Sequence, residues 1–256
     1  FVFVTQGAVS VGEGDQRVSV GQAPLIGAMR VTADEHPEFS FRMIDGDPAT
    51  NLKEQAADIA ALALSDESES EIALRAGDCF VPRLHEAPEA GMPSHDFQVK
   101  PGAAYLITGG LSSLGLRAAT VLAKAGARHI ILLSRRGLPP RSDWQSIAKG
   151  SETADRIAGV LAIESAGASI ETAALDISDE SAVNAFLKAR EAEMRPTIHG
   201  VIHLATSYET HLAANTSEST FNAALGPKLE GARLLDRLLP ELDLFLLYSS
   251  TMSFVP

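Results

Sequence analysis

A glycine-rich turn between a strand pattern and a helix pattern is the part of this chain best suited to chemistry. The segment reads Ala104-Tyr-Leu-Ile-Thr-Gly-Gly-Leu-Ser-Ser-Leu-Gly115. A strand that enters a helix through such a turn aims backbone N–H groups and the positive end of the helix dipole at a pyrophosphate. We therefore predict a nucleotide cofactor, held by the turn residues Thr108, Gly109, Gly110, Ser112, Ser113, Leu114 and Gly115.

The next strand pattern ends in basic residues. It reads Ile130-Ile-Leu-Leu-Ser-Arg-Arg136, at a point where a domain that prefers NAD usually carries an acidic residue for the ribose 2′-hydroxyl. Guanidinium groups at this point suit a 2′-phosphate instead. We therefore predict NADPH rather than NADH, with Ser134, Arg135 and Arg136 among its contacts.

The third strand pattern is followed by a carboxylate. Asp176, in Ala173-Ala-Leu-Asp-Ile177, can accept a hydrogen bond from the adenine amino group at the edge of the sheet. We include its neighbour Ile177 in the site. The alternative is that Asp176 caps the next helix, a role that Ser178 or Asp179 would fill more naturally.

The fourth strand pattern, Gly200-Val-Ile-His-Leu-Ala205, ends where the strand order of such a sheet reverses. Its backbone should lie beside the ribose on the nicotinamide side, which adds His203, Leu204 and Ala205 to the predicted cofactor site. The side chain of His203 fits a packed or locally hydrogen-bonded histidine better than an acid or a base.

Two polar residues follow that could act on a carbonyl group. Reduction of a ketone by a hydride requires a group that donates a proton to the oxygen and a group that stabilises its developing charge. Ser250, after the fifth strand pattern, and Lys228, on the preceding helix pattern, are the candidates. A solvated helix lysine and a serine in a turn would look the same, so spacing alone does not decide.

Strands and helices alternate through the second part of the chain. We expect strands at 104–108, 129–133, 169–174, 199–203 and 244–248, and helices at 112–126, about 153–166, 179–191 and about 217–239. This alternation predicts an α/β fold with a doubly wound parallel sheet, whose ligand lies at the carboxyl ends of the strands. Residues 137–152 are expected to form a surface connection.

The first part of the chain shows no chemistry of its own. We expect strands at 1–5 and 40–45, helices at 23–35 and 51–63, and a hairpin of 71–75 with 79–83. It has no glycine-rich turn and no cluster of metal ligands, so we predict a packing domain. The Pro- and Gly-containing stretch from Arg83 to Pro101 favours a boundary there, with one domain at 1–96 and the other at 97–256.

Composition excludes several classes of protein. The chain has 256 residues, of which 45% are hydrophobic and 21% charged, which is ordinary for a packed α/β protein. No apolar run reaches the roughly 18–20 residues that cross a bilayer, and no signal peptide pattern is present. A single cysteine, Cys79, favours the cytoplasm, and a net charge of −12 argues against nucleic acid as a partner. Strand-like ends at Phe1–Val4 and Phe245–Pro256 suggest a piece of a larger protein.

Several motifs in order resemble the ketoreductase of modular type I polyketide synthases, a relative of the short-chain dehydrogenases/reductases. They are Gln22-Ala-Pro-Leu-Ile-Gly27, Glu35-His-Pro37, Thr108-Gly-Gly110, Ser134-Arg-Arg-Gly137, Gly200-Val-Ile-His203, Pro227-Lys-Leu-Glu-Gly231 and Tyr248-Ser-Ser250. The resemblance covers nearly the whole chain. It implies two Rossmann-like subdomains, a degenerate structural one followed by an NADP-binding one that is incomplete at its C-terminus.

The resemblance also implies a reaction and partners. NADPH would reduce the β-carbonyl of a ketoacyl chain that an acyl carrier protein holds on its phosphopantetheine, with neighbouring synthase domains in the same polypeptide. Ser250 matches the serine that hydrogen-bonds the ketone oxygen, and Lys228 matches the lysine of the preceding helix. The proton-donating tyrosine of the family would fall thirteen residues after Ser250, outside this chain, so we expect this fragment alone to be inactive.

The chain departs from the family pattern at three places. Ser112 replaces the middle glycine of the turn, and His203-Leu-Ala-Thr206 replaces His-Ala-Ala-Gly. Tyr208-Glu209-Thr210 stands where one stereochemical fingerprint would be, and Val255 aligns with the tryptophan of the other. A reduction-inactive domain that acts as a scaffold or as an epimerase of an α-substituent is therefore the alternative. A free-standing short-chain dehydrogenase is a third, which the first 84 residues oppose.

Overall fold

The computed structural model describes residues 1–12, 19–86, 97–207 and 211–251. By its internal contacts the chain divides into two compact units. The first unit holds the described residues of 1–93, 211–215 and 250–256, and the second those of 94–210 and 216–249. Residues 208–210 and 255, which align with the two stereochemical signatures of the family, lie outside the described residues.

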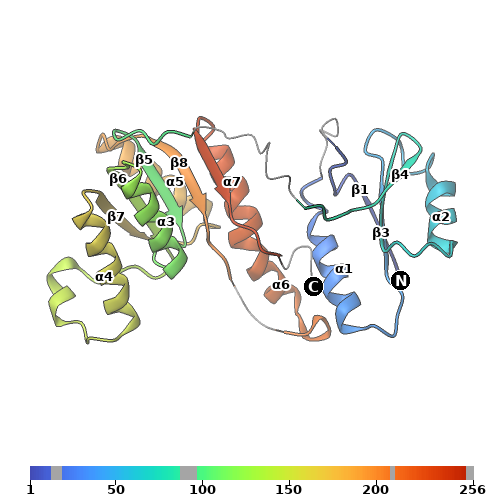
Figure 1. The fold of residues 1–256 in the computed structure, drawn as a ribbon, viewed down its shortest axis with the longest axis horizontal. Coiled ribbons are helices and arrows are strands. Elements are labelled where there is room, and N and C mark those ends of the chain that lie inside the picture. Colours follow the sequence, from blue (N-terminus) through green and yellow to red (C-terminus); the bar gives the residue numbers. More distant parts are fainter. Residues whose placement is uncertain (13–18, 87–96, 208–210, 252–256) are drawn as a thin grey trace. The chain divides into compact units, whose positions relative to one another are not determined.

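The first unit is a four-stranded sheet with one helix on each side (Figure 1). Strands β1, β2 and β3 are parallel in that order, and β4 pairs antiparallel with β3. A short 3-10 turn, η2 (Ala213–Asn215), joins this unit, because the Ala213 N–H donates to the Glu35 carboxylate at 2.6 Å. The other elements are β1 (Val2–Gln6), α1 (Pro24–Glu35), β2 (Arg42–Gly46), α2 (Ala56–Leu64), β3 (Glu71–Arg75) and β4 (Asp78–Phe80).

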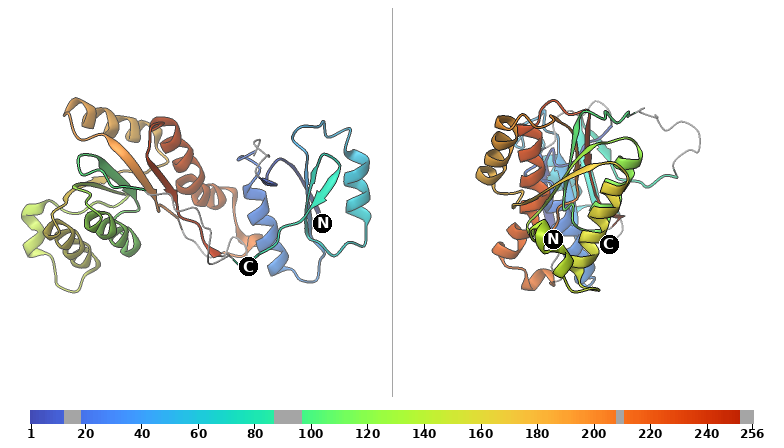
Figure 2. Two further views of the ribbon diagram at one scale, coloured as in Figure 1. Left: turned by 45° about the horizontal axis from the view of Figure 1, so that its top comes forward. Right: turned by 90° about the vertical axis from the view of Figure 1, so that its left-hand side faces the viewer.

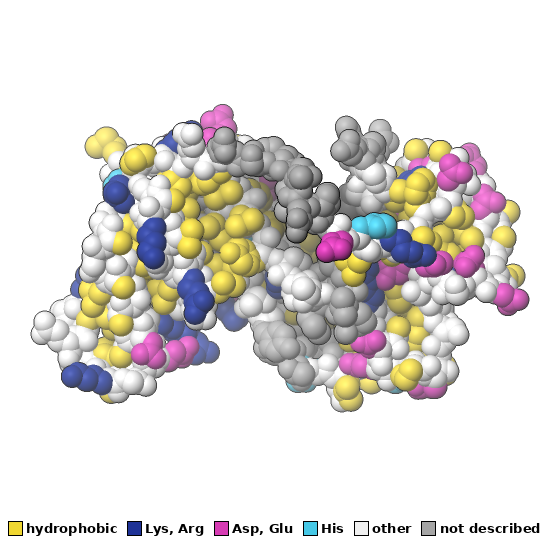
Figure 3. All heavy atoms as spheres, in the orientation of Figure 1, with side chains coloured by type: hydrophobic (Ala, Val, Ile, Leu, Met, Phe, Trp, Pro, Cys, Tyr) yellow, Lys and Arg dark blue, Asp and Glu magenta, His cyan; other side chains and the backbone are white. Residues whose placement is uncertain are grey.

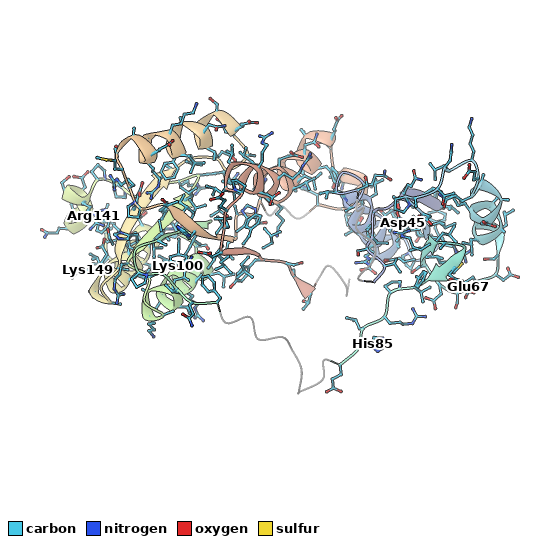
Figure 4. The ribbon with its side chains drawn as sticks, turned by 90° about the horizontal axis from the view of Figure 1, so that it is seen from above. Asp45, Glu67, His85, Lys100, Arg141 and Lys149 are labelled. Carbon is cyan, nitrogen blue, oxygen red and sulfur yellow. The ribbon has the colours of Figure 1, made fainter. Side chains whose placement is uncertain are left out.

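A buried carboxylate organises the carboxyl ends of these strands. Asp45, labelled in Figure 4, accepts hydrogen bonds from the Thr5 hydroxyl at 2.6 Å and from the Ala8 N–H at 2.7 Å. Its second oxygen lies 2.7 Å from the Arg75 guanidinium, and the Asp45 side chain is 3% exposed. The amides of the loop after β1 therefore bind a carboxylate of the same chain, at the end of the sheet where a nucleotide-binding domain would hold a phosphate.

The second unit is a five-stranded, entirely parallel sheet in the order β7-β6-β5-β8-β9. This order, with crossover helices between consecutive strands, is the doubly wound arrangement. Its strands are β5 (Ala104–Thr108), β6 (His129–Ser134), β7 (Ser169–Ala174), β8 (Ile198–His203) and β9 (Leu244–Leu247). Its helices are α3 (Ser113–Lys124), η1 (Arg141–Ser146), α4 (Glu152–Ser165), α5 (Glu180–Ala192), α6 (Glu218–Leu225), η3 (Gly226–Glu230) and α7 (Gly231–Leu238).

Helices lie on both faces of this sheet (Figure 2), and a hydrophobic cluster fills the space between the sheet and the helices on each face. On one face, Ile107 and Leu132 pack with Ala119 of α3 and Val160 of α4. On the other face the core is built from β5, β6 and β8 with α5 and α7, and it contains Leu106, Ile131, Val183, Val201 and Leu235. Burial of every second side chain on each face explains the continuous apolar runs of the central strands.

The predicted fold class is confirmed, and the predicted elements are found with small shifts of their ends. Two elements differ. The helix expected from residue 51 begins at Ala56, because the buried Gln55 side chain bonds the Asp47 N–H at 2.8 Å and the Asp47 carbonyl at 2.9 Å and so stabilises a loop. The long helix expected at 217–239 is divided into α6, the π-turn η3 and α7.

Strand β9 lies at one edge of the second sheet, and its last two residues are exposed hydrophobic residues. Leu246 is 41% exposed and Leu247 53%. Figure 3 shows hydrophobic side chains gathered over the part of this unit where α3 and α7 lie in Figure 1.

Among the described residues, no helix combines the length and the apolar character needed to cross a membrane.

Candidate cofactor site and active-site residues

A pocket of about 350 Å³ lies at the carboxyl ends of strands β5, β6, β7 and β8. In a parallel sheet the ligand site forms at this edge, where the crossover helices lead away to opposite faces. The lining residues are Thr108, Gly109, Leu111, Ser112, Leu133, Ser134, Arg135, Arg136, Glu152, Arg156, Leu175, Asp176, Ile177, Ala205, Thr206 and Pro227. The sequence analysis predicted nine of them: Thr108, Gly109, Ser112, Ser134, Arg135, Arg136, Asp176, Ile177 and Ala205.

The glycines of the turn are required by its geometry. Gly109 has φ +65°, and a Cβ there would lie 3.2 Å from the Ala205 nitrogen. A Cβ on Gly110 would come within 2.8 Å of the Leu132 Cα, and one on Gly115 within 2.6 Å of the Gly109 carbonyl oxygen. Gly110 and Gly115 do not line the pocket, so their part is to let the turn, strand β6 and helix α3 approach closely.

Ser112 is the N-cap of helix α3. Its backbone has φ −75° and ψ 163°, an extended conformation that any residue adopts, so this position does not need a glycine. Its hydroxyl accepts a hydrogen bond from the Gly115 N–H at 3.0 Å. Ser112 therefore fits the backbone of the turn, but its side chain lines the pocket and takes one of the amides of the helix start.

Basic residues form the side of the pocket at the end of β6. Ser134, Arg135 and Arg136 all line it, and both arginines are exposed. The Ser134 hydroxyl donates to the Arg136 carbonyl, which fixes the backbone of this segment. Two guanidinium groups beside a pocket of this kind supply the charge that a phosphate monoester requires.

Asp176 faces this basic side. Its Oδ1 accepts hydrogen bonds from the Ser178 N–H at 2.9 Å and from the Ser178 hydroxyl at 2.5 Å. The pKa of Asp176 is lowered, mainly by the bond from the Ser178 hydroxyl, and the positive charge of Arg135 adds to the effect. Asp179, not Asp176, caps helix α5 through the Ala182 N–H at 3.1 Å. The capping alternative for Asp176 is therefore wrong.

Sequence reasoning missed two charged residues of the pocket. Glu152 and Arg156 lie in the first turns of α4 and form an ion pair with each other. Helix α4 follows β6, so its first turns return to the carboxyl edge of the sheet, and this topology was the available signal. The helix was predicted at about 153–166, within one residue of its observed start, but the side chains of its first turns were not assigned to the site. The other lining residues that were missed are Leu111, Leu133, Leu175, Thr206 and Pro227.

The ends of β5 and β8 are joined through Thr108. Its hydroxyl oxygen accepts the N–H groups of Leu204 at 3.1 Å and Ala205 at 3.0 Å, and it lies 2.8 Å from Nδ1 of His203. The imidazole is 5% exposed, and its Nε2 lies 2.8 Å from the Pro227 carbonyl oxygen. The buried, locally bonded histidine expected from the sequence is what the structure shows.

Besides Gly110 and Gly115, four predicted residues near the turn and β8 lie outside the pocket lining. Ser113 and Leu114 are exposed in the first turn of α3, and His203 and Leu204 lie behind the pocket floor, which Ala205 and Thr206 form. Leu204 packs against the core on the α3 and α4 side. Leu204, which replaces the first alanine of the family's His-Ala-Ala-Gly, therefore packs into the core. Thr206, which replaces the glycine, lines the pocket.

Lys228 and Ser250 belong to different units. Lys228 is exposed in the π-turn η3, next to Pro227 of the pocket wall. Ser250 follows β9 and is grouped by its contacts with the first unit. Their joint action on one carbonyl group therefore stays a prediction.

The residues present fit a dinucleotide. Gly109, which has a positive φ, and the N-cap Ser112 line the pocket where helix α3 begins, which is the arrangement that binds a diphosphate at a helix start. The neighbouring strand end adds two exposed arginines, and the third adds an ionised carboxylate. Ser112 and Thr206, which both line the pocket, act against this fit.

Comparisons with known proteins agree with this geometry. Residues 103–255 match the KR domain family, and residues 1–84 match the family described as polyketide synthase extender module SpnB, Rossmann fold domain. The 6-methylsalicylic acid synthase of Penicillium expansum is 33% identical over 252 residues, which are 96% of this chain and 14% of that protein. The 5-methyl-1-naphthoate synthase of Streptomyces sahachiroi is 35% identical over 247 residues, 94% of this chain and 13% of that protein.

Solved structures show the same fold. A ketoreductase from the first module of phoslactomycin biosynthesis in Streptomyces sp. HK803 superposes with a TM-score of 0.78 at 32% identity, over 98% of this chain and 55% of that one. A structure of A-type ketoreductases from a modular polyketide synthase gives a TM-score of 0.79 at 31% identity, over 98% and 50%. This chain spans about half the length of these solved structures and about one seventh of the curated relatives. It belongs to the ketoreductase (KR) domain family of polyketide synthases.

Proposed function

We propose that this chain carries the NADPH-binding part of a reductase that converts a β-ketoacyl thioester to the β-hydroxyacyl thioester. Membership of the KR family supports an oxidoreductase that uses a nicotinamide cofactor. We place the structural subdomain at 1–96 and the cofactor-binding subdomain at 97–256, in a protein of the cytoplasm. The observation that carries the proposal is that the glycine-rich turn lines the same pocket as Arg135 and Arg136.

NADPH supplies a hydride when it is bound. The amides of the turn at Gly109 and of the start of α3 would hold the pyrophosphate, because Gly109 and the N-cap Ser112 both line the pocket. Arg135 and Arg136 would hold the 2′-phosphate by charge-assisted hydrogen bonds, and Asp176 would accept from the adenine amino group. Ala205 and Thr206, at the end of β8, would support the nicotinamide side.

The chain's own part in the chemistry is to orient the carbonyl group and to bear charge on its oxygen. Ser250 would donate a hydrogen bond to the ketone oxygen, which polarises the carbonyl carbon toward hydride. The ammonium group of Lys228 would stabilise the developing alkoxide until a proton donor neutralises it. These two roles rest on the family pattern at Tyr248-Ser-Ser250 and Pro227-Lys-Leu-Glu-Gly231.

The substrate and partners follow from the same proposal. An acyl carrier protein would present the ketoacyl chain on phosphopantetheine, and further synthase domains would lie in the same polypeptide. The relatives support this, because this chain matches only 14% of the 6-methylsalicylic acid synthase of Penicillium expansum.

One observation favours a second function. The Ser112 hydroxyl occupies the Gly115 amide, and Thr206 adds bulk to the pocket floor. Both changes reduce the room and the hydrogen bonds for a nicotinamide dinucleotide. A domain that keeps the shape of a reductase and serves as a scaffold, or as an epimerase of an α-substituent, would tolerate both.

One experiment separates the two functions. The natural polypeptide that carries this sequence is mixed with NADPH and a β-ketoacyl-pantetheine thioester, and both NADPH consumption and the β-hydroxyacyl product are followed. The reductase proposal requires one product for each NADPH consumed. Binding of NADPH without product, or no binding, contradicts it and supports the reduction-inactive domain.

A further inference from the structure

The helix that bears Lys228 is widened at one turn. In η3 (Gly226–Glu230) the Gly231 N–H donates to the Gly226 carbonyl, five residues back, instead of the four of a regular helix. Pro227 explains the widening, because it has no N–H to donate and its ring would collide with the carbonyl four residues earlier. Lys228 is the next residue, so the geometry of this turn decides where its side chain leaves the helix.

His203 bonds to this turn from the sheet. Its Nε2 lies 2.8 Å from the Pro227 carbonyl oxygen, and its Nδ1 lies 2.8 Å from the Thr108 hydroxyl. The Thr108 oxygen already accepts the N–H groups of Leu204 and Ala205 at 3.1 and 3.0 Å. Its hydrogen must therefore point to Nδ1, which leaves Nε2 as the protonated nitrogen that donates to Pro227. One tautomer satisfies every bond.

The surroundings of the imidazole exclude a direct part in proton transfer. The ring is 5% exposed, and both nitrogens are used within the protein. Burial lowers the pKa of His203 and outweighs the opposite effect of the bond to the Pro227 carbonyl, and the charge of Lys228 lowers it further, which favours the neutral ring. Gly231 lets the helix lie close to the residues around the ring, because a Cβ there would lie only 3.0 Å from the Ile177 Cγ2; its distance to the His203 Cε1 would be 3.4 Å, an ordinary contact.

We propose that His203 is a positioning residue for Lys228, a hydrogen-bonded link that fixes the π-turn to the ends of strands β5 and β8. Through Thr108 the same link reaches the first residue of the glycine-rich turn, so the lysine and the cofactor cradle are held by one buried chain of hydrogen bonds. The inference that this serves catalysis rests on the proposed reductase function. The structural link itself does not.

Three variants test the link. In His203→Gln the side-chain amide can place an N–H near the former Nε2 and keep the bond to Pro227. His203→Asn is shorter, so it can keep the bond to Thr108 but cannot reach Pro227. His199→Gln is the matched control, since it makes the same change four residues earlier on β8, where the histidine is partly exposed and pairs with Asp243.

Two measurements on the 256-residue chain need no cofactor. Nitrogen-15 NMR of the histidines at neutral pH should show His203 protonated at Nε2 and bare at Nδ1. Amide hydrogen exchange at Leu229–Ala232 should accelerate about tenfold in His203→Asn, and less than about threefold in His203→Gln and His199→Gln. The opposite tautomer, or equal exchange in the Asn and Gln variants, overturns the proposal.

A third measurement tests the catalytic consequence in the natural polypeptide. His203→Asn should lower kcat at least about tenfold while KM for NADPH changes less than about twofold, and His203→Gln should restore most of kcat. If His203→Asn changes neither exchange nor kcat, the positioning role is wrong. If neither the natural polypeptide nor its variants reduce the ketone, the proposed function is wrong. The tautomer and exchange measurements still test whether His203 holds the π-turn.

Discussion

The Ser112 hydroxyl accepts a hydrogen bond from the Gly115 amide at 3.0 Å, inside the turn that should cradle a pyrophosphate. Replacing Ser112 with Gly frees this amide for a phosphate oxygen and removes a Cβ from the pocket wall. We predict that Ser112→Gly binds NADPH roughly three- to tenfold more tightly, the size of one charge-assisted hydrogen bond. Fluorescence titration of NADPH measures the change.

The matched control for this substitution is Ser112→Ala. It also frees the amide but keeps a Cβ, and it removes the helix cap at a cost of about 1 kcal/mol in unfolding free energy, against a few tenths for glycine. Equal or weaker NADPH binding by Ser112→Gly would show that Ser112 does not obstruct the cofactor.

Gly109 cannot carry a side chain without strain. We predict that Gly109→Ala loses about 1–2 kcal/mol of unfolding free energy because of its φ of +65°, and that it weakens NADPH binding through the contact of the new Cβ with Ala205. Gly102→Ala, where nothing lies within 4 Å of the new Cβ, should stay within about 0.5 kcal/mol. Urea unfolding of both variants decides, and equal losses would refute the strain argument.

The carboxylate of Asp45 is the main buried charge of the first unit. Asp45→Asn removes the negative charge beside the guanidinium of Arg75, whose side chain is 11% exposed, so we predict a loss of about 3 kcal/mol in unfolding free energy. Glu38→Gln, which alters an exposed hydrogen bond with His36, should change stability by less than about 1 kcal/mol. If chemical denaturation shows losses of similar size, the buried network does not stabilise this unit.

The neutral state of His203 predicts a pH dependence of stability. Its folded-state pKa lies below the ordinary value of 6.5, so on acidification the unfolded chain takes up the proton first. The unfolding free energy should therefore fall as the pH decreases from about 6.5 toward the folded pKa, by at most about 1.4 kcal/mol per pH unit. His203→Gln removes this contribution. The difference in unfolding free energy between the unchanged protein and the variant should therefore change with pH between about 6.5 and the folded-state pKa. A flat difference would contradict the assignment.

Much of the second unit was predictable because its elements are locally determined. The apolar runs at Ile130–Leu133 and Leu244–Leu247 require strands, and the turn at Gly109 requires glycine for its positive φ. The basic strand end followed directly from Arg135 and Arg136. Each of these signals lies in a few consecutive residues, and topology brings their ends to one edge.

The features that escaped prediction depend on contacts between distant residues. The π-turn arises from Pro227, a visible signal that was not used, but its bond to His203 needs the folded sheet. Glu152 and Arg156 line the pocket because the connection between β6 and α4 brings the start of α4 back to the carboxyl edge of the sheet. No short sequence pattern specifies that return. In the first unit, the Asp45 network joins residues about 40 positions apart, which no local pattern reveals.

The most direct test of the cofactor assignment is a side-by-side titration of this chain with NADPH and NADH, repeated for Arg135→Ala. Arg135 and Arg136 at the pocket edge predict that NADPH binds at least about tenfold more tightly, and that the variant loses most of this preference while its affinity for NADH changes little. Equal affinities for the two nucleotides, or no binding of either, would contradict the NADPH site.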